Sequence, residues 1–309
     1  MSRLVWVPRG AEELTADPTV GVEIVEIPAD PASDARLGEV EMLVAPLRSS
    51  TFDATMQFGE LWDRMSSLRV VQVLSAGVDW IVDSVPSDIV LCSARGAHTV
   101  PVAEWVLTAI LSGVKELERF RDDQVAGRWD PRDCHELAGA EVMILGHGSI
   151  GHAVEQRLRP FGPTIRRVAR HAREDVATME ALPEMLPQAD VVVLLLPLTA
   201  DTERIVDDRF LARMRSGALL VNAARGRLVD TDALIDALHR GRVRAVLDVT
   251  DPEPLPAGHP LWRAPGLLIT PHVAGGSPRS RERVFALVRA QIERFARDEP
   301  LENVVRGGY

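Results

Sequence analysis

The stretch VMILGHGSIGHAV, residues Val142–Val154, is the part of the sequence on which the fold assignment depends. A short apolar run leads into Gly146, Gly148 and Gly151, which are spaced as G-x-G-x-x-G, and a helical pattern follows. In a dinucleotide-binding turn the first glycine allows a tight bend and the second lets a pyrophosphate approach the backbone. The third lets the helix pack on the strand. The spacing alone is a weak signal, and a glycine-rich loop in an unrelated α/β domain is the alternative.

The composition restricts the class of protein. A chain of 309 residues favours two domains, and 46% hydrophobic residues supply substantial cores. A formal net charge of -10 and an aromatic content of 5% disfavour a general nucleic-acid binder. Two cysteines outside any C-x-x-C pair argue against a structural zinc site and fit a reducing cytoplasm. We expect a soluble cytoplasmic protein, because there is no signal-peptide pattern and no apolar run long enough for a bilayer.

Aliphatic runs alternate with polar or helical segments along the chain, which is typical of parallel α/β sheets. A long helix is expected over Pro101–Phe120 and an amphipathic one over 277–300. The second helix could pack back onto the first domain, which would make that domain discontinuous. The expected strands are 3–7, 41–46, 69–74 and 88–94, then 141–146, 163–169, 189–197, 217–224, 244–250 and 266–272.

The end of the strand after the glycine turn bears on the choice of cofactor. NAD sites usually place Asp or Glu there, about 20 residues after the turn, to hold the ribose hydroxyls. Here the stretch is RVARHAR, Arg167–Arg173, with Ala169 at the expected acidic position. Arg170, His171 and Arg173 would accommodate a 2′-phosphate, which a carboxylate would repel. The sequence therefore favours NADP over NAD, and a solvated basic strand end is the alternative.

Chemically active residues follow three later strands. Arg225 stands in VNAARG, Asp248 and Glu253 in VLDVTDPEPLP, and His272 in LLITPHVAGG. Ligands bind at the carboxyl ends of strands in open α/β sheets, so we expect these side chains to share one site. Each residue taken singly has an ordinary structural explanation, but the set in this order points to catalysis.

These stretches together resemble the D-isomer-specific 2-hydroxyacid dehydrogenase family. The resemblance also includes LPLTADT, HPLW, SAGVDW and VPVAEWVL, and it covers essentially the whole chain. It implies two Rossmann-like doubly wound parallel-sheet domains with a cleft between them. The implied substrate-binding domain is flavodoxin-like and comprises residues 1–96 and 276–309. The NAD(P)-binding domain, residues 97–275, is inserted into it.

The resemblance also implies a reaction and roles for particular residues. Hydride passes between the nicotinamide and the carbonyl carbon of a 2-keto acid, while His272 exchanges a proton with the oxygen. Glu253 would keep the imidazole charged and oriented, and Arg225 would bind the substrate carboxylate. The expected substrate contacts are Arg48, Ala76, Gly77, Val78, Arg225 and His272. The expected cofactor contacts are Gly146, Gly148, Ser149, Ile150, Gly151, Ala169, Arg170, His171, Arg173, Leu196, Pro197, Thr202, Ala223, Ala224, Asp248, His272, Ala274 and Gly275, with Asp248 on the nicotinamide carboxamide.

The substrate itself stays open at this point. Glyoxylate, hydroxypyruvate or a longer 2-keto acid would fit, and Arg48 would either meet a second anionic group or stand exposed in a loop. Formate- or phosphite-type dehydrogenases share the Arg and His, and the family includes dinucleotide-binding corepressors without enzymatic activity. The intact Arg–Glu–His set favours an enzyme. The family is usually dimeric through the cofactor domain, with the helix over Pro101–Phe120 in the contact.

Overall fold

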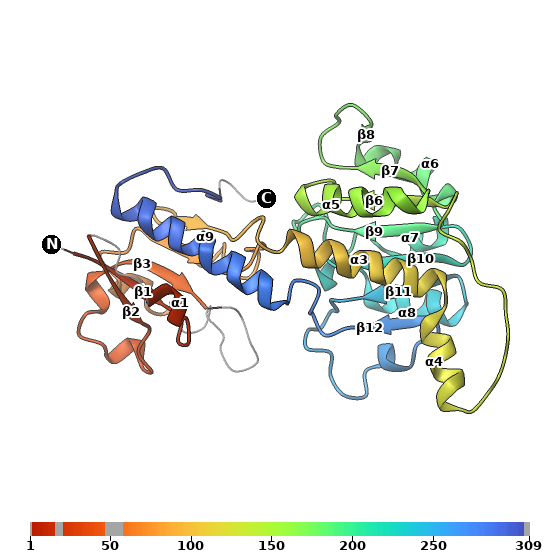
Figure 1. Ribbon diagram of the computed structural model, residues 1–309, viewed down its shortest axis with the longest axis horizontal. Helices are drawn as coiled ribbons and strands as arrows, with labels where there is room; N and C mark the ends of the chain where they lie inside the picture. The colour runs from red at the N-terminus through yellow and green to blue at the C-terminus, as the bar shows by residue number, and fades with distance from the viewer. Residues whose placement is uncertain (1, 16–20, 47–57, 306–309) are drawn as a thin grey trace. The chain divides into compact units, whose positions relative to one another are not determined.

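The computed structural model describes residues 2–15, 21–46 and 58–305, and it divides into two compact units. The first unit comprises residues 1–98 and 277–309, and the second comprises residues 99–276. Each unit is an α/β domain built on one parallel sheet (Figure 1). Within the described residues, no helix has the length and apolarity needed to cross a membrane.

The first unit is built on a parallel sheet in the order β2-β1-β3-β4-β5, which is the flavodoxin-like order 2-1-3-4-5. Successive side chains of a strand point to opposite faces of the sheet. Leu4 and Trp6 of β1 therefore join one core, and Val5 and Val7 join the other. The elements are β1 (Arg3–Val7), α1 (Glu12–Thr15), β2 (Val22–Glu26), η1 (Pro31–Ser33), η2 (Leu37–Glu39), β3 (Val40–Ala45), η3 (Trp62–Arg64), β4 (Val70–Val73), β5 (Val90–Cys92) and α9 (Pro278–Ala296).

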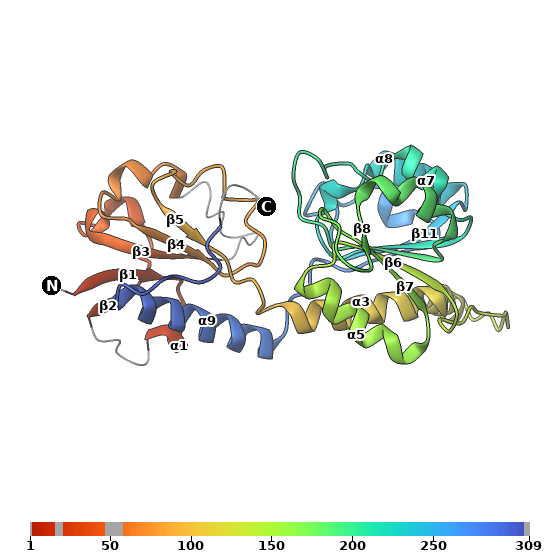
Figure 2. The same cartoon turned by 90° about the horizontal axis from the view of Figure 1, so that it is seen from above.

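The C-terminal helix α9 covers one face of this first sheet together with α1 (Figure 2). Its buried residues Val284, Val288 and Ile292 recur at helical spacing and pack against the strands. The side chain of Ser277 caps the helix by accepting a hydrogen bond from the Ser280 amide at 3.0 Å. The chain therefore leaves the first unit and returns to it after 99–276.

The second unit has a parallel sheet in the order β12-β11-β10-β9-β6-β7-β8. Counted from its first strand, this is the doubly wound order 3-2-1-4-5-6 with a seventh strand added at the far edge. Helices α3 and α5 cover one face, and α7 and α8 cover the other (Figure 2). The elements are α3 (Thr99–Val114), α4 (Leu117–Val125), β6 (Glu141–Leu145), α5 (Ser149–Leu158), η4 (Arg159–Phe161), β7 (Thr164–Val168), β8 (Val176–Ala177), η5 (Met179–Ala181), α6 (Leu182–Met185), η6 (Leu186–Gln188), β9 (Val191–Leu194), α7 (Asp208–Arg213), β10 (Ala218–Asn222), η7 (Gly226–Leu228), α8 (Thr231–His239), β11 (Val243–Leu247), η8 (Pro260–Arg263) and β12 (Leu267–Ile269).

The single helix expected over Pro101–Phe120 is wrong, because two helices occupy this stretch. Helix α3 ends at Val114, and α4 begins at Leu117. Between them Glu116 adopts a left-handed conformation with φ of 50°, which a continuing α-helix cannot contain. The apolar periodicity continues through this break and therefore did not reveal it.

Candidate active site

The glycine turn joins β6 to α5 in the predicted strand–turn–helix arrangement. Gly146 has a φ of 101°, and a Cβ there would lie 2.4 Å from the carbonyl carbon of Leu195. A Cβ on Gly151 would lie 2.4 Å from the carbonyl oxygen of Gly146. Both positions therefore require glycine on steric grounds. A Cβ on Gly148 would meet no atom within 4 Å, so this position leaves open space beside the turn.

The N-terminus of α5 suits an anionic ligand. Gly148 is its N-cap residue and provides no side-chain cap, and the first helical residue, Ser149, is exposed. The amides of a first helical turn have no partner within the helix and carry the positive end of its dipole. The open space beside Gly148 and this uncapped helix end fit a dinucleotide pyrophosphate.

The basic stretch after β7 lies next to this turn. Ala169 follows the strand, and its amide donates to the carbonyl of Ala177 at 2.9 Å. The position expected to be acidic in an NAD site therefore carries a methyl group. Arg170 and His171 are exposed, and Arg173 donates from Nη2 to the carbonyl oxygen of His147, inside the glycine turn, at 2.9 Å.

The ends of three adjacent strands bring the predicted catalytic residues to one edge of the second sheet. Arg225 follows β10, Asp248 follows β11 directly, and His272 follows β12. These strands are neighbours in the order β12-β11-β10 and run parallel, so their carboxyl ends lie side by side (Figure 1).

His272 and Glu253 form a short contact, with Nδ1 of the imidazole 2.6 Å from Oε1 of the carboxylate. This hydrogen bond and the charge of Glu253 raise the pKa of His272 above its ordinary value, although partial burial opposes the shift. Burial is the largest single effect on Glu253 and raises the pKa of its carboxyl, but the contact with His272, a backbone hydrogen bond at Thr250 and the charge of Arg225 together lower it overall. The pair therefore favours imidazolium beside carboxylate.

Asp248 fixes the backbone that carries His272. Its buried carboxylate accepts hydrogen bonds from the hydroxyl of Thr270 at 2.6 Å and from the amides of Val273 at 2.9 Å and Ala274 at 2.8 Å. The Asp248 carbonyl also accepts from the His272 amide at 2.7 Å. These bonds hold His272 in a left-handed conformation with φ of 54°, which is uncommon for a residue with a side chain. A carboxylate has about four acceptor positions, so one remains for a further donor.

Arg225 is presented by a turn that two neighbouring residues define. The buried side chain of Asn222 donates to the Arg225 carbonyl at 2.9 Å and accepts from the Ala224 amide at 3.0 Å. A Cβ on Gly226 would lie 1.9 Å from the carbonyl oxygen of Thr250, so the turn packs directly on the loop that leads to Glu253. The positive charge of Arg225 weakly opposes the rise in the pKa of His272 and contributes to the lowered pKa of Glu253, so the three groups interact electrostatically.

The other expected cofactor contacts lie in loops at the same edge of this sheet. Thr202 is engaged by its own loop, because its hydroxyl donates to the Pro197 carbonyl at 2.7 Å and accepts from the Thr199 amide at 2.8 Å. Leu196 is buried, whereas Ala223 and Ala224 are half-buried. Ala274 and Gly275 follow the loop that Asp248 holds.

The expected substrate contacts Ala76, Gly77 and Val78 belong to the first unit, in the loop after β4. Ser75 shapes this loop, since its hydroxyl donates to the Gly77 carbonyl at 2.6 Å and accepts from the Trp80 indole at 3.1 Å. Arg48, the remaining expected contact, lies outside the described residues.

The structure adds residues to the site that the sequence did not single out. Asn222 shapes the turn that carries Arg225. Gly226 lets the backbone of this turn pack closely against the carbonyl of Thr250 in the loop after β11. The indole of Trp105 on α3 donates to the Thr270 hydroxyl at 3.1 Å, which in turn donates to Asp248. An asparagine at the end of the apolar run ALLVN was a sequence signal for Asn222, but no local pattern links Trp105 to Thr270.

Comparison with known proteins identifies the family to which this chain is similar. The D-isomer specific 2-hydroxyacid dehydrogenase, NAD binding domain family matches residues 107–274. The chain is 38% identical over 250 residues to (S)-sulfolactate dehydrogenase of Chromohalobacter salexigens, covering 76% of this chain and 80% of the relative.

Two solved structures match nearly the full length. A D-isomer specific 2-hydroxyacid dehydrogenase family protein from Aeromonas salmonicida has a TM-score of 0.84 at 30% identity, covering 99% of both chains. An NADPH-dependent glyoxylate/hydroxypyruvate reductase from Sinorhizobium meliloti, solved with NADP and sulfate, has a TM-score of 0.82 at 28% identity, covering 99% of this chain and 98% of the other. On these matches, the chain belongs to the D-isomer specific 2-hydroxyacid dehydrogenase family.

Proposed function

We propose that this protein is an NADPH-preferring reductase that interconverts 2-keto acids and D-2-hydroxy acids. The observation that carries the proposal is the contact of 2.6 Å between His272 and Glu253 at the strand ends that also present Arg225. Glyoxylate, hydroxypyruvate and longer 2-keto acids are the proposed substrates, and the (S)-sulfolactate dehydrogenase relative adds 3-sulfopyruvate as a candidate. Backbone amides of Ala76, Gly77 and Val78 are further proposed to bind the substrate carboxylate.

The proposed roles follow from the positions of the groups. When bound, the nicotinamide supplies the hydride for reduction. Because Nδ1 of His272 is engaged with Glu253, Nε2 is the nitrogen that would donate a proton to the keto oxygen. The proton completes the hydroxyl, and the ring is left neutral, with the proton that remains on Nδ1 still hydrogen-bonded to Glu253. The Arg225 guanidinium offers parallel donors that match a carboxylate.

Three features support NADPH as the preferred cofactor. Ala169 replaces a ribose-binding carboxylate, Arg170 is exposed beside it, and Arg173 is anchored to the glycine turn. Two structural relatives were solved with NADPH or NADP. A guanidinium binds a phosphate as a charge-assisted, frequently bidentate pair.

The decisive experiment is a substrate panel with purified protein. NADPH oxidation should follow addition of at least one of glyoxylate, hydroxypyruvate, pyruvate or 3-sulfopyruvate, with a higher kcat/KM for NADPH than for NADH. His272→Ala should lower kcat by roughly 10²- to 10⁴-fold while cofactor still binds. Absence of turnover across the panel with either cofactor would refute the reductase proposal. Oxidation of formate or phosphite instead would assign the alternative chemistry.

We also propose a homodimer formed through the second unit. Leu117 and Val125 on α4 and Trp129 in the loop after it are 55%, 70% and 96% exposed. Large apolar side chains gathered on one exposed element are typical of an interface, and a second copy is the commonest partner. Light scattering should give twice the monomer mass for the wild type and a monomer for Trp129→Ser. A monomeric wild type would contradict the proposal.

A cytoplasmic location is proposed from the cysteines. Cys92 and Cys134 are both free thiols, as expected where glutathione keeps cysteines reduced. Fractionation of cells that produce the protein should recover it with cytoplasmic markers, and recovery with a membrane or secreted fraction would contradict this location.

A further inference from the structure

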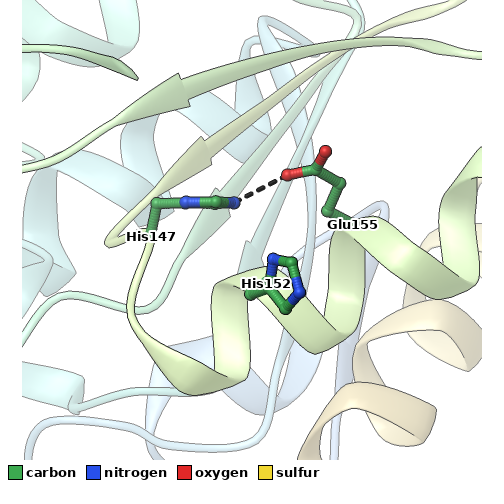
Figure 3. Close-up of side chains that lie close together, drawn as sticks. All are labelled: His147, His152 and Glu155. Carbon is green, nitrogen blue, oxygen red and sulfur yellow. Dashed lines mark hydrogen bonds and ion pairs between the residues drawn. The ribbon is translucent and has the colours of Figure 1, made fainter. Parts of the chain in front are cut away.

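Helix α5 carries a charged side chain in an unusual place. Glu155 is 2% exposed, yet both of its carboxylate oxygens are surrounded by basic groups. Oε1 accepts hydrogen bonds from the Nη2 atoms of Arg159 and Arg167, each at 2.6 Å. Oε2 accepts from Nε of Arg167 at 2.8 Å and lies 2.7 Å from Nε2 of His147 (Figure 3). The carboxylate is therefore saturated with donors, and the hydrogen bond from Arg167 holds its pKa well below the ordinary value.

The same neighbourhood has ligand types that metal ions use. His147, His152 and Glu155 each offer an atom within 4.8 Å of the others. In Figure 3 the His147 ring is joined to Glu155, whereas His152 has no such bond to the pair, and its Nε2 instead lies 3.0 Å from the side chain of Gln156. A divalent cation would have to displace the arginines from Glu155 and stand beside their charges. The arrangement is therefore better explained as a clasp, formed by His147, Glu155 and Arg167.

This clasp is connected to the loop of residues 169–175 at two points. Nη1 of Arg167 donates to the Asp175 carbonyl at 3.4 Å, near the end of the loop. Nη2 of Arg173 donates to the carbonyl of His147 at 2.9 Å. His147 thus contacts Glu155 through its ring and Arg173 through its backbone, and it stands between the first two glycines of the turn. One buried carboxylate consequently orients the glycine turn and the basic loop together.

We propose that the clasp of His147, Glu155 and Arg167 determines cofactor selectivity, by holding Arg173 where it meets the 2′-phosphate of an adenine dinucleotide. The proposal rests on the proposed preference for NADPH and deepens it. An unrestrained arginine loses rotamer freedom when it binds, and prior anchoring reduces that cost. A dinucleotide without a 2′-phosphate makes no use of the anchored guanidinium, so the clasp discriminates between the two cofactors.

The test compares two neighbouring histidines. His147→Ala removes the clasp contact, and His152→Ala is the matched control, because His152 is exposed and pairs with Gln156. Titration calorimetry should show the Kd of NADP⁺ rising about tenfold in His147→Ala, equivalent to about 1.4 kcal/mol. The Kd of NAD⁺ should stay within about twofold, and His152→Ala should change neither. His147→Gln, whose amide can donate to Glu155, should restore much of the NADP⁺ affinity.

A double-variant cycle tests whether His147 acts through Arg173. Arg173→Ala should weaken NADP⁺ binding, and adding His147→Ala to it should produce little further loss. Full additivity would overturn the proposal, and so would equal weakening of NADP⁺ and NAD⁺ by His147→Ala. Equal effects of both histidine variants, with Zn²⁺ bound by the wild type alone, would assign a metal site instead. A wild type that binds NAD⁺ more tightly would refute the cofactor preference itself, and with it the role of the clasp.

Discussion

Nδ1 of His272 lies 2.6 Å from Oε1 of Glu253, and the two residues come from different loops of the second unit. Their side chains are 50% and 40% exposed, so solvent screens the interaction and its contribution to folding is small. Its consequence lies in proton affinity, because the contact raises the pKa of the imidazole above the ordinary value of about 6.5.

The first prediction concerns the pH dependence of the reaction. Reduction of a 2-keto acid needs protonated His272, so kcat/KM should be high at low pH and fall as pH rises through the raised pKa of His272. Oxidation of the 2-hydroxy acid needs neutral His272 and should rise over the same interval. Initial rates in both directions across pH 5–10 would measure the two limbs.

Glu253→Gln provides the comparison for this pH profile. It removes the negative charge while keeping a hydrogen-bond acceptor, so the descending limb for reduction should move to lower pH. Asp236→Asn on the exposed face of α8 removes a charge elsewhere in the same unit and should leave the limb in place. An unshifted limb in Glu253→Gln would exclude Glu253 from control of the His272 pKa.

The second prediction concerns the hydrogen-bond chain from Trp105 through Thr270 to Asp248. Thr270→Val removes a donor to the carboxylate that holds the His272 backbone, and Trp105→Phe removes only the donor to Thr270. One such bond contributes about 1 kcal/mol, so kcat should fall about fivefold in Trp105→Phe and further in Thr270→Val. Cofactor Kd should change little in Trp105→Phe. Steady-state kinetics and titration calorimetry separate the two effects, and an unchanged kcat in both variants would contradict the positioning role.

The sequence anticipated the parts of the fold that depend on local pattern. Buried parallel strands are nearly continuous apolar runs, and the runs at β6, β9 and β10 were accordingly recognised. Strand β2, VEIVE, was missed because it lies at a sheet edge, where half-exposed positions accept glutamate. Strand β8 has two residues and carries no periodicity.

Residues of the candidate site could be predicted from the sequence only where the residue type itself indicates a chemical role. Arg225, Glu253 and His272 are conspicuous in the sequence, and the structure brings them to one edge. Trp105 and Thr270 are separated by 165 positions, and their contact arises from packing of α3 near the end of β12. Glu155 resembled an ordinary helical glutamate, because its burial depends on arginines from other elements.

The third prediction distinguishes the glycines of the turn. A Cβ on Gly151 would collide with the Gly146 carbonyl at 2.4 Å, so Gly151→Ala should destabilise the protein. A Cβ on Gly148 meets no atom, and its φ of -85° suits any residue. Gly148→Ala should therefore keep the wild-type Tm and weaken NAD⁺ and NADP⁺ alike, because the methyl group would occupy the space proposed for the pyrophosphate. Unchanged cofactor affinity in Gly148→Ala would remove the turn from that role.

The fourth prediction concerns the stability contribution of Glu155. Its pKa is lowered in the folded protein, so its stabilisation is present above the unfolded value of about 4.3 and declines as pH falls below that value. Glu155→Gln removes the carboxylate that pairs with the half-buried Arg167 and the exposed Arg159, and it should cost about 1.5–3 kcal/mol at pH 7.

The difference in unfolding free energy between wild type and Glu155→Gln should shrink by about 1.4 kcal/mol for each pH unit below about 4.3. Urea titrations at pH 7, 4 and 3 would measure this difference. Glu293→Gln is the control, because Glu293 of α9 forms an ion pair with Arg297 in which both side chains are exposed. A difference that is the same at all three pH values would mean that Glu155 stabilises the protein by packing and not by its charge. A constant difference would also weaken the assignment of the clasp, because the hydrogen bonds from His147 and Arg167 require an ionised carboxylate as their acceptor.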